Sequence, residues 1–273
     1  MFLYIDPYGI KALNCWQFDG FARSGFNSIE LLINLNSFGF IREACNALGT
    51  RFDDKELFDD LVEYEPSRFV ASEKSIQDLN DIAGGDYWQE IIKDYKASKI
   101  DGYEAEKTFA DEYCRRLSHS YKYVLNLPLR IKPGQRPKYR MVHATNHKDG
   151  CLLMVDNIYN RWQNLRDIQN YGQMSLFEET FDNEIIDIDD IKEKARRHFS
   201  KYTTAISLHE ALANFFVEYG AICATNHIKD ILKTWEKAGI IEVIRNPQTT
   251  NNGKATTFMS EGRGKTVSVR WKK

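Results

Sequence analysis

The chain has 273 residues, enough for about two domains that each bury a core of their own. Hydrophobic residues make up 42% of the sequence and charged residues 28%, which is ordinary for a soluble globular protein. The formal net charge of −2 excludes a basic field over the whole chain but leaves room for a local basic surface. No segment is apolar enough to span a membrane, and the short N-terminal apolar run lacks the basic flank of a signal peptide. We therefore expect a cytoplasmic protein.

The cysteines are scattered along the chain, at Cys15, Cys45, Cys114, Cys151 and Cys223. None forms a C-x-x-C pair, and none combines with histidine at the spacing of a metal site. We therefore expect reduced thiols in the cores of a cytosolic protein, and no bound metal.

The first predicted element is a buried strand over residues 2–5 that ends at Asp6-Pro7-Tyr8-Gly9. An apolar run that stops at an acid, a proline and an aromatic is typical of a parallel strand at the carboxyl edge of an open α/β sheet. Such sheets carry their sites at this edge. The same residues also suit a β-turn, with proline second and glycine fourth, so a structural interpretation stays open.

The following segments predict a mixed domain of helices and strands. A short helix over 14–23 and a second apolar strand over 28–36 make the two strands parallel neighbours joined by a right-handed crossover. Helical spacing of apolar residues over about 38–120 predicts a helical insertion. Two strands around a Pro-Gly loop within 121–144 predict a hairpin, and an amphipathic helix is expected over 150–162.

The composition changes after this amphipathic helix. Between Tyr171 and Ile191 there are seven acidic residues and no lysine or arginine. Residues 166–190 are therefore interpreted as an acidic linker between two domains.

One short motif lies inside this linker. Gln173, Leu176 and Phe177 resemble the peptide by which bacterial DNA-processing proteins bind the sliding clamp, with two apolar side chains that enter a pocket. The alternative is that Leu176 and Phe177 only fasten the linker to a domain.

Residues 191–273 predict a second compact domain. The expected elements are helices over 192–202, 209–219 and 225–238, a strand over 240–245, and a hairpin over 256–271 that turns at Gly262-Arg263-Gly264. Three helices followed by a basic hairpin predict a winged helix.

This domain carries the local basic surface that the net charge conceals. Residues 241–273 contain seven lysines and arginines against two glutamates. Such side chains suit phosphate contacts beside a groove, although winged helices also serve as protein-docking or dimer modules. The residues predicted to bind nucleic acid are Lys229, Lys233, Arg245, Lys254, Arg263 and Lys265.

The opening motif has a specific chemical interpretation. Methylation of an exocyclic amine requires that the nitrogen lone pair points at an electrophilic methyl group. The Asp6 carboxylate and the Pro7 carbonyl can accept the two N–H bonds of such an amine, and the proline ring fixes the direction of that carbonyl. Tyr8 can stack on an extruded base. Asp6, Pro7 and Tyr8 are therefore the predicted catalytic residues.

Three segments resemble one known family: Ile5-Asp6-Pro7-Tyr8-Gly9, the strand Leu31-Leu32-Ile33-Asn34, and Ala144-Thr145-Asn146-His147 followed by Gly150 and Met154. They resemble the three-Cys-motif partner proteins, a bacterial and phage family similar to class I S-adenosylmethionine-dependent methyltransferases. The resemblance implies a partial Rossmann-like methyltransferase domain over 1–165 and a substrate-binding role for Asn146 and His147. It also implies a neighbouring protein as partner, whose three cysteines are not those of this chain.

The sequence departs from this family in the cofactor site. The family's glycine-rich first strand and loop, and the acid that holds the ribose, have no counterpart here, because Gly84-Gly85 and Gly102 lie in helical surroundings. S-adenosylmethionine is therefore expected only if a second polypeptide or another copy of the chain supplies that part. A homo-oligomer is one of these arrangements.

Two functions follow, and the sequence leaves open whether the chain is an enzyme. The first is the catalytic and substrate-binding half of an amino-methyltransferase that acts on nucleic acid and is inactive alone. The second is a non-catalytic module, in which a degenerate methyltransferase-like sheet carries a winged helix to DNA or to a protein. Both expect an α/β fold, made of the C-terminal portion of a Rossmann-like sheet with a helical insertion, followed by a winged-helix domain.

Overall fold

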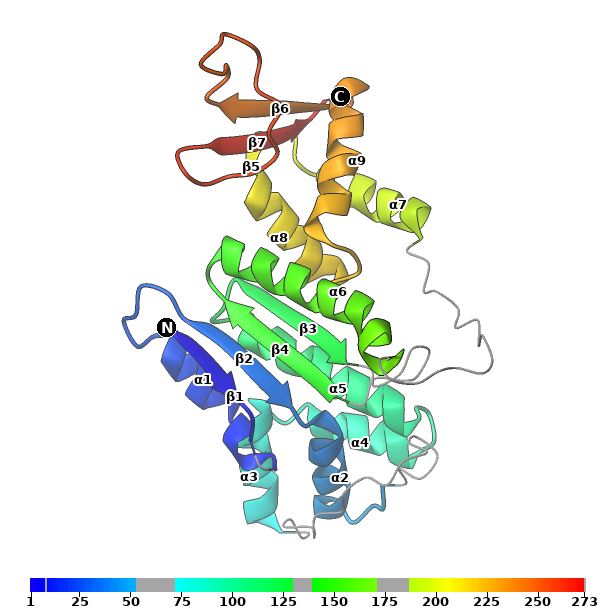
Figure 1. The fold of residues 1–273 in the computed structure, drawn as a ribbon. Coiled ribbons are helices and arrows are strands. Elements are labelled where there is room, and N and C mark those ends of the chain that lie inside the picture. Colours follow the sequence, from blue (N-terminus) through cyan, green and yellow to red (C-terminus); the bar gives the residue numbers. More distant parts are fainter. Residues whose placement is uncertain (8, 53–71, 130–138, 171–186, 273) are drawn as a thin grey trace. The chain divides into compact units, whose positions relative to one another are not determined.

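The computed structural model describes residues 1–7, 9–52, 72–129, 139–170 and 187–272 (Figure 1). The chain divides into two compact units, unit 1 over Met1–Asn146 and unit 2 over His147–Lys273. Both combine helices with strands, so the expected α/β class is confirmed. No helix within the described ranges combines the length and the apolar character needed to cross a bilayer.

Unit 1 is built on a four-stranded mixed sheet in the order β1-β2-β4-β3. Its strands are β1 (Phe2–Ile5), β2 (Glu30–Leu35), β3 (Tyr123–Leu129) and β4 (Tyr139–Thr145). β1 and β2 are parallel, whereas β4 runs antiparallel to both β2 and β3. The predicted parallel first pair and the predicted antiparallel hairpin are therefore both confirmed.

Helices occupy most of the remaining described part of unit 1. They are η1 (Lys11–Leu13), α1 (Cys15–Ala22), α2 (Ser37–Ala47), α3 (Glu73–Ala83), α4 (Trp88–Lys96) and α5 (Gly102–Leu117). The predicted helical segment between the second and third strands is therefore confirmed over the residues that are described.

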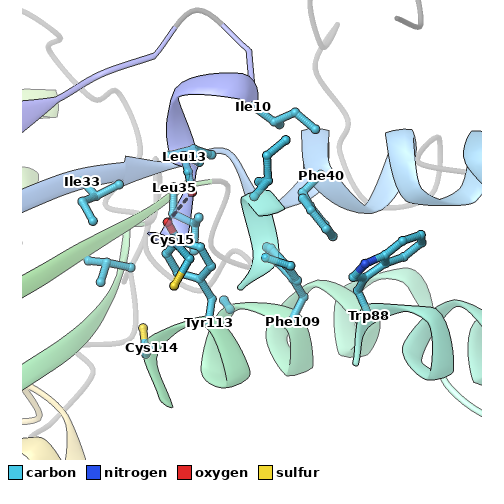
Figure 2. Packing of buried hydrophobic residues seen from close by; sticks show 14 of the residues in the cluster. Ile10, Leu13, Cys15, Ile33, Leu35, Phe40, Trp88, Phe109, Tyr113 and Cys114 are labelled. Carbon is cyan, nitrogen blue, oxygen red and sulfur yellow. Dashed lines mark hydrogen bonds between the residues drawn. The ribbon is translucent and has the colours of Figure 1, made fainter. Parts of the chain in front are cut away.

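One face of the sheet packs against these helices through every second strand residue. Ile33 and Leu35 of β2 are buried in the core cluster (Figure 2). Phe109 of α5 stacks on Phe40 of α2 with ring centroids 3.9 Å apart, and Trp88 of α4 meets Phe40 edge-on. Burial of each large apolar side chain contributes about 1.5–3 kcal/mol, so this cluster fixes three helices against the sheet.

Polar side chains determine where several of these helices begin. Asn14 and Asn36 each accept a hydrogen bond from the first-turn backbone of α1 and α2. Asp101 and Glu104 form a reciprocal capping box at the start of α5. Asn36 directly follows β2, so the cap also fixes the chain at the carboxyl end of that strand.

Unit 2 combines helices with a three-stranded antiparallel sheet in the order β5-β7-β6. Its elements are α6 (Lys148–Asn170), α7 (Ile188–Phe199), β5 (Ile206–Ser207), α8 (Leu208–Tyr219), α9 (Thr225–Lys237), β6 (Ile241–Asn246) and β7 (Thr266–Trp271). The three predicted helices after residue 190 are confirmed with small shifts of their ends.

The boundaries of the predicted linker differ from the structure. α6 continues to Asn170 and α7 begins at Ile188, so both ends of the predicted linker 166–190 are helical. The prediction ended this helix at Trp162, although Leu165 and Ile168 continue the helical spacing of apolar residues toward Asn170. The boundary between the compact units also falls before α6, at Asn146, whereas the sequence grouped this helix with the first domain.

The predicted hairpin over 256–271 is wrong. Residues 256–261 form no strand, and β7 pairs instead with β6 on one side and β5 on the other. The turn at Gly262-Arg263-Gly264 is present, closed by one isolated bridge between Gly262 and Lys265. Val267 and Val269 of β7 are buried, and this apolar face selects the sheet partners that the local turn signal did not reveal.

Candidate functional site

Two polar side chains meet at the carboxyl ends of the parallel strands β1 and β2. The register pairs Ile5 with Ile33, so Asp6 comes next to Asn34. The Asn34 Nδ2 amide donates a hydrogen bond of 2.8 Å to Asp6 Oδ1. Asp6 is exposed, so its carboxylate is fixed by the sheet and remains accessible to a ligand.

Tyr4 joins this pair from two positions earlier on β1. Its side chain is 55% exposed. Partial burial, the negative charge of Asp6 and a hydrogen bond to Asp6 together raise the pKa of the Tyr4 phenol. Tyr4 and Asp6 therefore lie on the same face of the strand and interact, an arrangement that the sequence analysis did not single out.

The chain turns immediately after Asp6. Pro7 is half-buried, and Tyr8 lies outside the described residues, so its predicted stacking role has no structural account here. Gly9 has φ = 88°, a left-handed conformation that strains any residue with a Cβ. The motif is thus a turn as well as a strand end, and the two interpretations of the sequence are compatible.

Six residues form two matched rows on the face of the sheet opposite the core. Phe2 pairs with Glu30 and Tyr4 with Leu32 in the parallel register, and Asp6 bonds to Asn34. We call this surface the β1–β2 face; its residues are Phe2, Tyr4, Asp6, Glu30, Leu32 and Asn34. Each residue of this set is exposed or half-buried.

His143 of β4 lies beside this face and is fully buried. Its Nε2 atom is 3.7 Å from Glu30 Oε2, beyond hydrogen-bond distance, and neither ring nitrogen is hydrogen-bonded within the described residues. Burial lowers the pKa of His143, and the Glu30 carboxylate opposes this effect. The net effect lowers the pKa and so favours the neutral form of His143.

The structure does not bring Asn146 to Asp6. Thr145 pairs with Glu30, at the amino end of β2, whereas Asp6 lies beside Asn34 near its carboxyl end. Four residues of strand separate the two positions by about 13 Å. Asn146 instead accepts a 2.6 Å hydrogen bond from the Lys122 backbone and so closes the β3–β4 pair. His147 belongs to unit 2, where its Nδ1 is 3.9 Å from Asp149.

A buried ion pair that the sequence did not reveal lies near the carboxyl ends of β1 and β2, where Arg140 pairs with Leu35 in the register. Arg140 of β4 donates to both Glu106 carboxylate oxygens, at 2.5 and 2.8 Å, and Ser37 at the start of α2 donates at 2.5 Å. The side chains of Arg140 and Glu106 are only 5% and 1% exposed. Burial alone would lower the pKa of Arg140, but Glu106 outweighs burial and raises it.

The predicted nucleic-acid residues of unit 2 fall into two groups. Lys254, Arg263 and Lys265 are exposed in the connection between β6 and β7. On α9, Lys233 is exposed and pairs with Asp230 at 2.8 Å, whereas Lys229 is half-buried and burial lowers its pKa. The exposed cations of the β6–β7 connection are the ones best able to reach a polyanion.

Arg245 has a different environment from the other predicted contacts. Its two Nη atoms each donate a 2.6 Å hydrogen bond to Glu236 of α9, and its Nε donates to the Phe258 carbonyl at 2.8 Å. The side chain is only 9% exposed. Arg245 therefore ties the β6–β7 connection to α9 and does not present its charge to solvent.

Glu261 fastens the other end of that connection. Its carboxylate accepts hydrogen bonds from Lys148 Nζ at 2.7 Å and from Ser207 Oγ at 2.9 Å, and from the backbone of His209. Burial raises the pKa of Glu261, but these donors outweigh burial and lower it. The sequence counted Glu261 only as an acid among basic residues and gave no sign of this role.

Two further predictions concern thiols and peptide motifs. Every cysteine is free and buried, and burial raises the pKa of Cys15, Cys45, Cys151 and Cys223 to about 12, so these thiols are unreactive. No group of ligands able to hold a metal ion occurs among the described side chains. The predicted clamp-binding residues Gln173, Leu176 and Phe177 lie outside the described residues.

Comparison of the chain with known proteins found no similar protein. No family model matches the chain, and neither a curated protein nor a solved structure matches it.

Proposed function

We propose that unit 1 is the substrate-binding part of an S-adenosylmethionine-dependent methyltransferase that acts on an amino group of a nucleic-acid base. The observation that carries the proposal is the Asp6–Asn34 pair at the carboxyl ends of two parallel strands. Ligand sites of open α/β sheets lie at this edge. The resemblance of the surrounding motif to the three-Cys-motif partner family gives the pair its chemical interpretation.

The proposed chemistry uses two hydrogen-bond acceptors at the end of β1. The Asp6 carboxylate and the Pro7 carbonyl accept the two N–H bonds of the substrate amine, which turns the nitrogen lone pair away from the protein. Asn34 keeps the carboxylate in place by its 2.8 Å hydrogen bond, so the acceptor is oriented before the substrate arrives. S-adenosylmethionine, when bound, supplies the electrophilic methyl group.

The topology of unit 1 supports this proposal. β1 and β2 are parallel, and β4 is antiparallel to β2. β4, the last strand of unit 1 in the sequence, lies between β2 and β3 in the sheet. This arrangement is compatible with the C-terminal portion of a Rossmann-like methyltransferase sheet. The buried Glu106–Arg140 pair further supports a fixed carboxyl edge.

Unit 2 is proposed to be a winged helix that delivers the nucleic acid. Three helices, α7 to α9, accompany a small antiparallel sheet whose last two strands enclose a long connection. Lys254, Arg263 and Lys265 are exposed in that connection and suit phosphate contacts. Glu236 and Glu261 hold the connection at both ends and so reduce the entropy lost on binding.

The test is a methyl-transfer assay on the tagged chain purified from its native host with the proteins that accompany it. Radiolabelled S-adenosylmethionine and single- or double-stranded DNA or RNA are the substrates. Asp6→Ala is expected to reduce transfer by roughly 100-fold or more, the effect of removing one well-placed polar group from an active site. Asp86→Ala, which removes an exposed acid between α3 and α4, is the matched control. Full transfer by Asp6→Ala contradicts the assignment.

A second function is favoured by a different observation. Among the described strand-to-helix turns of unit 1, those after β1 and β2 contain Gly9 and Asn36-Ser37 but no run of glycines. In this second proposal the chain is a non-catalytic DNA- or protein-binding module. Its sheet lacks a glycine-rich cofactor loop, and unit 2 makes the contact with DNA or protein. Nucleic-acid binding with full affinity by the Asp6→Ala variant, and no methyl transfer by the wild type with its accompanying proteins, would favour this alternative.

A further inference from the structure

The β1–β2 face exposes aromatic side chains where an exposed strand face would ordinarily carry polar ones. Phe2 and Tyr4 are each 55% exposed, and Leu32 beside Tyr4 is half-buried. The alternate residues Leu3 and Ile5 pack against the core, so Phe2 and Tyr4 stand on the opposite side of β1. Both rings are therefore available for contact with a ligand.

The spacing of this face suits flat ring systems. Adjacent strands lie about 4.8 Å apart, and alternate residues of one strand about 6.7 Å apart. Tyr4 and Leu32 therefore form a continuous apolar area next to the Asp6–Asn34 pair, and Phe2 continues it along β1. A planar ring that lies over Tyr4 brings its edge to the Asp6 carboxylate.

The charges on the face select the ligand. Asp6 stands at one end of the rows and Glu30 at the other, and the six residues include no lysine or arginine. Two carboxylates repel phosphate but attract the N–H groups of an amine. The face is thus complementary to the base of a nucleotide. The sugar-phosphate backbone of the nucleic acid must run elsewhere.

We propose that the β1–β2 face is a stacking platform for an amino-bearing base, adenine or cytosine, presented by single-stranded or extruded nucleic acid. This inference rests on the proposed function and identifies residues that the motif did not contain. Tyr4 stacks on the target base, and Phe2 stacks on its neighbour. Asp6 accepts an N–H bond of the amino group, and Asn34 holds Asp6 in place. Stacking on exposed aromatic strand residues is a general way to bind single strands.

The test is a titration of the full chain with nucleosides, in which saturation-transfer NMR measures the binding. Nucleosides lack phosphate, so the basic residues of unit 2 contribute nothing to their binding. Cytidine and adenosine are compared with uridine and inosine, which replace the amino group by a carbonyl. The proposal expects the amino-bearing member of each pair to bind at least fivefold more tightly.

The variants divide stacking from amine recognition. Tyr4→Ala is expected to weaken cytidine binding by about fivefold to a hundredfold, the range found for loss of one stacking ring. Tyr4→Phe keeps the ring and should bind within about threefold of the wild type. Phe26→Ala removes an equally exposed aromatic of unit 1 from outside the face and should change nothing. Phe2→Ala should weaken a dinucleotide more than a nucleoside.

Three results would overturn the proposal. Unchanged cytidine binding by Tyr4→Ala together with loss in Asp6→Ala removes the platform and leaves the proposed function intact. Equal binding of cytidine and uridine removes amine recognition at this face. Binding of a lysine-containing peptide in place of the nucleosides, or self-association that Tyr4→Ala abolishes, assigns the face to a protein. None of these readouts needs methyl transfer, so the fate of the proposed function is judged separately by its own assay.

Discussion

Replacing Arg140 by methionine tests how the carboxyl edge of the sheet is held. Glu106 is 1% exposed and receives two of its hydrogen bonds from Arg140. The Arg140→Met variant therefore leaves a buried carboxylate that has lost its cation and keeps the hydrogen bond from Ser37. Loss of one partner of a buried ion pair costs about 3–5 kcal/mol. At about 2–4 °C per kcal/mol, the melting temperature of unit 1 should fall by roughly 6–20 °C.

The companion variant removes both charges. In Arg140→Met with Glu106→Leu no buried charge remains, and replacement of a buried pair by apolar residues is often neutral. The free energy of unfolding should return to within about 1 kcal/mol of the wild type. Arg115→Met is the control, because Arg115 also pairs with a glutamate but its side chain is 57% exposed, and its loss should change stability by less than about 1 kcal/mol.

Urea denaturation followed by circular dichroism measures these differences. Destabilisation of Arg140→Met by less than about 1 kcal/mol would show that the carboxylate of Glu106 does not depend on its partner. A double variant as unstable as the single one would show that packing at position 140, and not the buried charge, stabilises this edge.

Three further predictions concern charge. Burial and the charge of Asp6 together raise the Tyr4 pKa, so Asp6→Asn should lower it part of the way toward its ordinary value near 10. ¹³C NMR of labelled tyrosine measures this pKa, and no change would contradict the Tyr4–Asp6 contact. Burial raises the pKa of Glu218, but hydrogen bonds from Lys201, His198 and Tyr219 outweigh burial and lower the pKa to about 2. The contribution of Glu218 to the free energy of unfolding is therefore present above about pH 4.5 and is lost as the pH falls toward 2. Because the side chain is partly exposed, that contribution is about 1 kcal/mol, and Glu218→Gln should flatten the acid branch of the stability curve by this amount. Alanine at both Arg263 and Lys265 should reduce the slope of log K against log salt for duplex DNA by about 2, and an unchanged slope would exclude them as phosphate contacts.

The sequence predicted the local elements well where one periodicity dominated. The apolar run from Ser28 to Asn36 predicts a buried strand, and β2 is found there as a parallel neighbour of β1. Buried and half-buried residues alternate along it. The helices α8 and α9 follow from apolar spacing and a clear stop at Gly239, which has φ = 71°. In these segments local preference and tertiary packing agree.

Long-range pairing set the limit of the prediction. Arg140 and Glu106 are 34 residues apart, and only the register of β4 against β2 brings an arginine to the core side of the sheet. The turn at residues 262–264 indicated a hairpin, but the strand after it pairs with β6 because its valines complete an apolar face. Turn chemistry fixes a turn and does not choose the strand that pairs across it.

The candidate site was predicted in part. Asp6 and Pro7 were identified from the order of residue types, whereas Asn34 was noted only as part of an apolar strand. Its link to Asp6 depends on parallel register, which spacing along the chain does not encode. Asn146 was grouped with Asp6 through family resemblance, and the register separates them by the length of β2.

The central claim is that Asp6 receives an amino group for methylation. The most direct measurement is nucleoside mass spectrometry of DNA and RNA from native-host cells that carry Asp6→Ala in the chromosome, compared with unaltered cells. In these cells every partner of the chain is present at its natural level. The account predicts that one amino-methylated base found in unaltered cells disappears in the variant. Identical amounts of every amino-methylated base in the two strains would contradict the account.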